Sequence, residues 1–126
     1  MLSKYLIPDY VFEHYDDVTP AFLASIGVRA LLIEIDNTLA PYEQPTSDER
    51  HRAWFDALDA AGIRTALISN NHRERVDEFN ATLGREAYFH SAKPFGVTFR
   101  REMKGWGLPR EQVAVLGDRL LTDALG

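Results

Sequence analysis

The sequence predicts a domain of the α/β class: a three-layer, Rossmann-like arrangement around a parallel sheet of about four strands. Near-continuous apolar runs of strand length alternate along the chain with segments whose apolar residues recur at helical spacing, which is typical of βαβ units. A chain of 126 residues, 45% of them hydrophobic, is long enough for one core and rarely has two. We therefore expect a single domain over residues 1–126.

The first expected elements are a short helix and a central strand. Residues 2–26 form an irregular lead and a helix, for which Thr19 is the expected N-cap, Pro20 the first residue and Gly27 the end. Residues 29–35 are almost continuously apolar, as in a parallel strand that is buried on both faces.

A longer helix is expected next, over residues 47–61. Thr46 and Glu49 have the spacing of a capping box, and Trp54 and Leu58 lie one turn apart on one face. The remaining elements are expected at residues 63–68 (strand), 71–83 (helix), 86–89 (strand), 95–106 (helix), 113–116 (strand) and 119–125 (the start of a helix).

Composition excludes several classes of function. Without cysteine, the chain has no disulfide, no thiolate zinc site and no cysteine nucleophile. Its 14 basic and 19 acidic residues leave a net charge of −5, which counts against nucleic acid as the main partner. No apolar run approaches the roughly 18 residues of a membrane span, and residues 1–10 do not resemble a signal peptide. We expect a cytoplasmic protein.

Polar side chains gather where the predicted strands end, and ligands of open α/β sheets bind beyond these ends. In chain order they are Glu34, Asp36, Thr38, Ser69, Asn70, Lys93, Asp118 and Asp123. Crowded carboxylates repel unless a cation binds among them, and hard oxygens suit Mg²⁺. A hydroxyl and helix-start amides can hold a phosphate, and a lysine can neutralise its charge.

The first two carboxylates suggest covalent catalysis. In an extended strand Glu34 and Asp36 point to the same side, so one can attack a phosphorus atom while the other protonates the leaving oxygen. These are the parts of phosphoryl transfer through an aspartyl-type intermediate.

Four motifs, in this order, resemble the haloacid dehalogenase (HAD) superfamily of phosphatases, and within it the short, capless YqeG-like branch. They are Glu34-Ile35-Asp36-Asn37-Thr38-Leu39, Ile68-Ser69-Asn70-Asn71, Lys93-Pro94 and Gly117-Asp118-Arg119-Leu120-Leu121-Thr122-Asp123. The resemblance covers most of the chain. It implies a Mg²⁺-dependent phosphatase of phosphomonoesters, and relatives in this branch act on phosphatidylglycerophosphate.

The resemblance also implies a role for each residue. Asp36 corresponds to the general acid and base, whose backbone carbonyl also binds Mg²⁺, and Glu34 stands at the position of the nucleophile and metal ligand. Lys93 corresponds to the catalytic lysine that steadies both the nucleophile and the phosphate. The other implied roles are phosphate binding for Ser69 and Asn70, metal binding for Asp118, and support for Thr38 and Asp123.

Glu34 departs from the family motif, which has aspartate at the nucleophile. Glutamate is one methylene longer, so its carboxylate is displaced by about 1 Å, and a shift of this size can cost on the order of 10²-fold in rate. We expect metal and phosphate binding to survive better than turnover. The alternative is a catalytically silent HAD-like domain that binds a phosphate or a partner.

The C-terminus is the second departure. Relatives continue beyond the fourth motif into a fifth strand, whereas this chain ends at Gly126. We therefore expect a HAD-like core without that strand, C-terminally short, in which residues 113–116 form an exposed apolar edge. Such an edge favours a homodimer through strand pairing.

Other partners and other folds remain open. The expected ligand is a phosphorylated small molecule or a lipid headgroup, with a peripheral contact at the inner membrane face. A basic run could attract anionic headgroups, although a solvated helix face is the simpler interpretation; its residues are Arg85, Lys93, Arg100, Arg101, Lys104 and Arg110. A phospho-acceptor domain of flavodoxin-like topology shares the chemistry, but the motif order argues against it. The four histidines are expected at the surface, and Trp54, Phe79, Phe99 and Met103 in the core.

Overall fold

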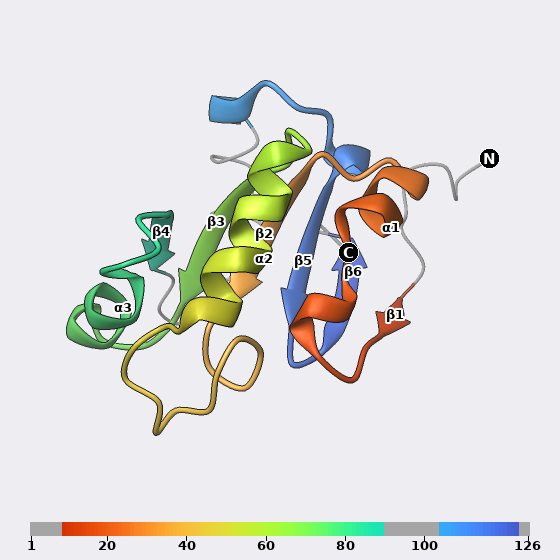
Figure 1. Ribbon diagram of the computed structural model, residues 1–126. Helices are drawn as coiled ribbons and strands as arrows, with labels where there is room; N and C mark the ends of the chain where they lie inside the picture. Colours follow the sequence, from red (N-terminus) through yellow and green to blue (C-terminus); the bar gives the residue numbers. More distant parts are fainter. Residues whose placement is uncertain (1–8, 90–103, 124–126) are drawn as a thin grey trace.

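A computed structural model of the chain describes residues 9–89 and 104–123, which form a six-stranded sheet in the order β1-β6-β5-β2-β3-β4 (Figure 1). The four predicted strands are present and parallel: β2 (Ala30–Glu34), β3 (Arg64–Ser69), β4 (Glu86–Phe89) and β5 (Val113–Gly117). Two further strands, β1 (Tyr10–Val11) and β6 (Leu120–Asp123), were not expected. Because β6 runs antiparallel to both of its neighbours, the sheet is mixed rather than parallel.

The helices lie close to their expected positions: α1 (Pro20–Ser25), α2 (Glu49–Ala60) and α3 (Arg73–Asn80), with short 3₁₀ turns at Tyr15–Asp17 and Arg110–Gln112. Thr19 caps α1 as predicted, accepting a hydrogen bond from the backbone N–H of Phe22 at 3.1 Å. The connection between β2 and α2, residues 35–48, carries no inserted domain, so the capless outline is confirmed.

The capping box predicted for α2 is wrong. Asp48, rather than Thr46, is the N-cap, and its side chain accepts from the N–H of His51 at 3.0 Å. The His51 imidazole accepts in return from the N–H of Asp48, also at 3.0 Å. The box therefore closes with histidine in the place that glutamate usually takes.

Both faces of the sheet are buried, which explains why the central strands are apolar without alternation. Leu31 and Ile33 face the large core that α1, α2 and α3 cover, where Phe55 and Phe79 are fully buried. Ala30 and Leu32 face the second cluster, against which Trp106 and Leu108 pack. Trp54 and Phe79 are in the core as predicted, while Phe99, Met103 and most of the helix expected at 95–106 lie outside the described residues.

Two expectations for the C-terminal part are wrong: the start of a helix at residues 119–125 and an exposed edge at residues 113–116. Residues 120–123 form a strand that pairs with β5 through a two-residue hairpin, with Gly117 opposite Leu120. Asp118 and Arg119, at the tip, have φ values of 50° and 64°, the type I′ geometry whose twist matches that of paired strands. The β5 edge is thus covered by β6, and β6 by β1, so the exposed apolar edge on which the expected dimer depended is not there.

Over residues 9–89 and 104–123, none of the helices has the length and apolar character needed to cross a bilayer.

Candidate active site

The carboxyl ends of β2, β3 and β5 meet at one edge of the sheet, the lower edge in Figure 1. Glu34 is the last residue of β2 and Ser69 the last of β3, and Asp118 follows β5 directly. Since β2 lies between β3 and β5, these three residues lie at the ends of neighbouring strands.

The Glu34 carboxylate lies against the backbone of Gly117. A methyl group added at Gly117 would be 2.6 Å from Glu34 Oε1 and 2.7 Å from its Cδ. The missing side chain at Gly117 therefore provides the space that the longer glutamate occupies. Burial, and then the negative charges of Asp118 and Asp36, raise the pKa of the Glu34 carboxyl above its ordinary value of 4.5.

The Asp36 carboxylate faces β3 and α3. Its Oδ1 accepts from Nε and Nη2 of Arg75 at 3.1 and 2.8 Å, and its Oδ2 accepts from Nδ2 of Asn71 at 2.9 Å. Strand β2 ends at Glu34, so the two-residue period of a strand does not extend to Asp36. Asp36 thus lies in the turn that follows the strand, and a common side for the two carboxylates stays a prediction.

A tight turn connects Asp36 to the rest of the site. The carbonyl of Ile35 accepts from the N–H groups of residues 38, 39 and 40 at 3.2, 3.0 and 3.2 Å, and Asn37 has a φ of 65°. Thr38 is buried, and its Oγ1 accepts from the backbone N–H of Asp118 at 2.5 Å. Thr38 thus connects this turn to the hairpin that carries Asp118.

The segment after β3 has the features of an anion site. The Ser69 hydroxyl is buried and accepts from the N–H of Asn71 at 2.9 Å, while Asn70 is exposed. Asn71 Oδ1 accepts from the N–H of His72 at 2.7 Å, which brings the chain into α3. The first N–H groups of a helix have no partner within it and can receive a phosphate oxygen.

Two predicted site residues remain to be considered, Lys93 and Asp123. Lys93 lies outside the described residues. Asp123 pairs with Ala114, three residues along β6 from the hairpin and so about 10 Å from it at strand spacing. The supporting role of Asp123 stays a prediction.

The oxygen ligands at this edge suit a hard divalent cation. In the described ranges, no three carboxylates or imidazoles converge on one point, because the Asp36 carboxylate faces Arg75. The ligands that remain are the carboxylates of Glu34 and Asp118 and the backbone carbonyl of Asp36. A cation there would offset the charges of Asp118 and Asp36, which add to burial in raising the pKa of Glu34, so these oxygens fit a hard divalent cation.

Three residues of functional interest were missed or misplaced by the sequence. Arg75 had only a weak signal, its place one turn before the core residue Phe79 in the predicted helix. Gly117 had no signal of its own. His51 was expected at the surface but is 2% exposed, with Nε2 2.6 Å from the carbonyl of Leu39.

The structure describes three residues of the predicted basic run, Arg85, Lys104 and Arg110. Arg85 is paired with Asp59 at 2.6 and 2.7 Å. Lys104 and Arg110 are exposed, and Lys93, Arg100 and Arg101 lie outside the described residues.

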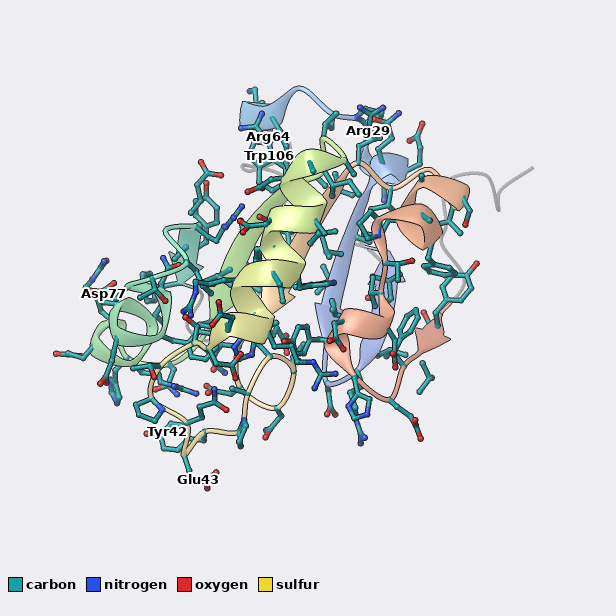
Figure 2. The ribbon with its side chains drawn as sticks, viewed as in Figure 1. Arg29, Tyr42, Glu43, Arg64, Asp77 and Trp106 are labelled. Atoms are coloured by element: carbon teal, nitrogen blue, oxygen red, sulfur yellow. The ribbon has the colours of Figure 1, made fainter. Side chains whose placement is uncertain are left out.

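Figure 2 shows Tyr42 and Glu43 at the tip of the connection between β2 and α2, while Arg64 and Trp106 lie at the opposite end of the molecule.

Comparisons with known proteins identify the family of the chain. The family model for haloacid dehalogenase-like hydrolases matches residues 8–126. The chain is 34% identical over 126 residues to the "Probable phosphatase YqeG" of Bacillus subtilis (strain 168), an alignment that covers all of this chain and 73% of that protein.

Two solved structures have the same fold. The cobalt-bound deoxy-D-mannose-octulosonate 8-phosphate phosphatase (YrbI) of Haemophilus influenzae matches with a TM-score of 0.61 and 19% identity, over 72% of this chain and 58% of that one. A hypothetical protein of Xanthomonas campestris matches with a TM-score of 0.61 and 20% identity, over 74% and 56% of the two chains. The chain therefore spans less than two thirds of either structure. The family match and the curated relative together show that this chain belongs to the haloacid dehalogenase-like hydrolases, an enzyme family, and is YqeG-like within it.

Proposed function

We propose that the protein is a Mg²⁺-dependent phosphatase that hydrolyses phosphomonoesters, with a turnover reduced by Glu34. The observation that carries the proposal is the position of Glu34 at the end of the central strand, half-buried beside Asp36 and Asp118, where burial and then the charges of Asp118 and Asp36 raise its pKa. Burial among like charges marks a carboxylate that is placed for chemistry or for a cation rather than for stability.

In the proposed reaction a Glu34 carboxylate oxygen attacks the phosphorus atom, and the bond from phosphorus to the alcohol oxygen breaks. Asp36 gives its proton to the leaving alkoxide, and the phosphoryl group stays on Glu34 as an acyl phosphate. Asp36 then takes a proton from water, which attacks the same phosphorus atom. The products are inorganic phosphate and a free Glu34 carboxylate.

Other residues hold the phosphate and its charge. Ser69, Asn70 and the first N–H groups of α3 bind phosphate oxygens, and Lys93 neutralises part of their charge. Glu34, Asp118 and the carbonyl of Asp36 hold Mg²⁺, which when bound offsets the repulsion between an anionic nucleophile and an anionic phosphate.

Glu34 is expected to slow the reaction without preventing it. Its carboxylate is folded against Gly117, and in-line attack depends on placement to within about 1 Å. A catalytically silent domain that binds a phosphate or a partner is the second candidate. It is favoured by the hydrogen bonds that occupy both oxygens of Asp36.

We extend the proposal to phosphatidylglycerophosphate, or a similar lipid headgroup, as the substrate. The site carries no cap between β2 and α2, so a headgroup held in a bilayer could reach it. Tyr42, which is 58% exposed beside the site, is a candidate for peripheral contact with the membrane interface.

The test is hydrolysis of p-nitrophenyl phosphate with and without Mg²⁺ by the chain and by Glu34→Asp. Glu49→Asp, in the exposed first turn of α2, is the matched control. Weak Mg²⁺-dependent activity that rises by about 10²-fold in Glu34→Asp alone supports the proposal. Absence of hydrolysis by both folded proteins overturns it and favours the silent domain. Vesicles containing the phosphorylated lipid then test the substrate.

A further inference from the structure

We propose that Arg75 is a positioning residue of this site, which joins the Asp36 carboxylate to the entrance loop, defined here as residues 41–44. The inference rests on the proposed function, in which Asp36 gives and takes the proton. Because Arg75 contacts both, the orientation of Asp36 and the position of the entrance loop depend on each other.

A single guanidinium group makes both sets of contacts. Nε and Nη2 of Arg75 donate to Asp36 Oδ1 at 3.1 and 2.8 Å. Nη2 also donates to the carbonyl of Pro41 at 3.2 Å, and Nη1 donates to the carbonyl of Gln44. Arginine can make these contacts at once because its donors form a flat fork, whereas lysine has one compact charged group.

The guanidinium is fixed in this orientation. The Arg75 side chain is 9% exposed, and its Cζ lies 5.4 Å from the centre of the Phe79 ring and 5.6 Å from that of Tyr42. Phe79 is fully buried and belongs to the core, while Tyr42 belongs to the entrance loop. Displacement of the loop therefore removes contacts that hold Arg75 against Asp36.

Asp36 depends on this contact for its direction. Asn71 holds Oδ2, so Arg75 and Asn71 together account for both carboxylate oxygens. Without Arg75, Oδ1 loses two charge-assisted hydrogen bonds and the carboxylate is free to turn about the bond to Asn71. A change in the loop must then affect Asp36, and a change in Asp36 must affect the loop to the same extent.

The chain contains a matched control in Arg85. It pairs with Asp59 at 2.6 and 2.7 Å, and its Cζ lies 4.9 Å from the ring of Phe55. It also contacts Thr65, near the start of β3, whereas Ser69 is at the other end of that strand. Loss of Arg85 thus removes a similar ion pair without touching the site.

The experiment compares Arg75→Ala and Arg75→Lys with Arg85→Ala, in the chain and in the Glu34→Asp background. With p-nitrophenyl phosphate and Mg²⁺, we expect kcat to fall about 10²-fold in Arg75→Ala, with a much smaller change in KM. Millimolar guanidinium should restore part of kcat, and Arg75→Lys should not. If Arg75→Ala does not fold, Arg75→Lys provides the comparison. A kcat equal to that of Arg85→Ala would overturn the proposal.

Amide hydrogen exchange in the entrance loop tests the coupling between this loop and Asp36 independently of activity. Exchange at residues 42–44 should be faster in Arg75→Ala and also in Asp36→Asn, and unchanged in Arg85→Ala. Unchanged exchange in Asp36→Asn overturns the coupling, whatever the kinetics show. If neither the chain nor Glu34→Asp hydrolyses any phosphomonoester, the proposed function fails, and the exchange result still decides on the coupling.

Discussion

The hydrogen bond between Thr38 and Asp118 joins two strand ends that are 80 positions apart in the sequence. Replacing Thr38 with valine keeps the shape of the side chain but removes the oxygen that accepts from the Asp118 N–H at 2.5 Å. This N–H lies at the start of a hairpin turn in which both residues have positive φ. We expect the turn to loosen and Asp118 to lose its fixed position.

The size of the effect follows from the surroundings of the donor. An N–H that loses its partner costs about 1–3 kcal/mol, and the lower end applies here because Asp118 is exposed and water can replace the oxygen. A loss of about 1 kcal/mol lowers the melting temperature by about 3–6 °C in a domain of this size. Thr38→Ser keeps the oxygen and loses one buried methyl group, worth about 0.8 kcal/mol. The two variants should therefore be similarly destabilised.

The assay is amide exchange at Asp118, measured by NMR together with titration of Mg²⁺. Thr38→Val should lose protection at this amide and bind Mg²⁺ more weakly, while Thr38→Ser should retain both. Equal protection of the Asp118 amide in the two variants would refute the role given to the Thr38 oxygen.

Three further predictions concern Glu34, its neighbour Gly117 and the buried imidazole. Because the folded-state pKa of Glu34 is raised, its stabilising contribution is complete below the ordinary value of 4.5 and is lost as the pH rises through the folded pKa. Without divalent cations, Glu34→Gln should thus melt at a higher temperature than the chain at pH 7, a difference that thermal scans should show disappearing below pH 4.5. Gly117→Ala places a methyl group 2.6 Å from Glu34 Oε1 and should weaken Mg²⁺ binding in calorimetric titration, but less in the shorter Glu34→Asp background. His51→Phe leaves the N–H of Asp48 and the carbonyl of Leu39 without their partner, and urea unfolding should show a loss of about 2 kcal/mol.

The central part of the fold could be predicted because burial on both faces leaves a strong sequence pattern. The predicted strands end within one residue of β2, β3, β4 and β5 at each C-terminal end. Strands β1 and β6 could not be predicted, because one has two residues and the other follows a turn without glycine. Asp118 and Arg119 adopt the positive φ values of the turn, whereas the sequence Asn-Gly at these positions would have predicted a hairpin.

For the candidate site too, part could be predicted from the sequence and part could not. Its place could be predicted, since Glu34 and Ser69 end two neighbouring strands and Asp118 directly follows a third. The direction of Asp36 could not, because it depends on a helix residue, Arg75, with no motif of its own. The accommodation of glutamate at position 34 depends on tertiary contact with the backbone of Gly117, which no local pattern reveals.

The pairing of β1 with β6 has a mechanical consequence. Tyr10 lies opposite Leu121 and Val11 opposite Leu120, so the chain enters and leaves the sheet at the same end of one antiparallel ribbon. Force applied between the two ends acts perpendicular to these two strands, so it breaks their hydrogen bonds one after another rather than all at once. The outer ribbon should therefore separate at low tension, while the parallel strands that carry the candidate site stay folded until later.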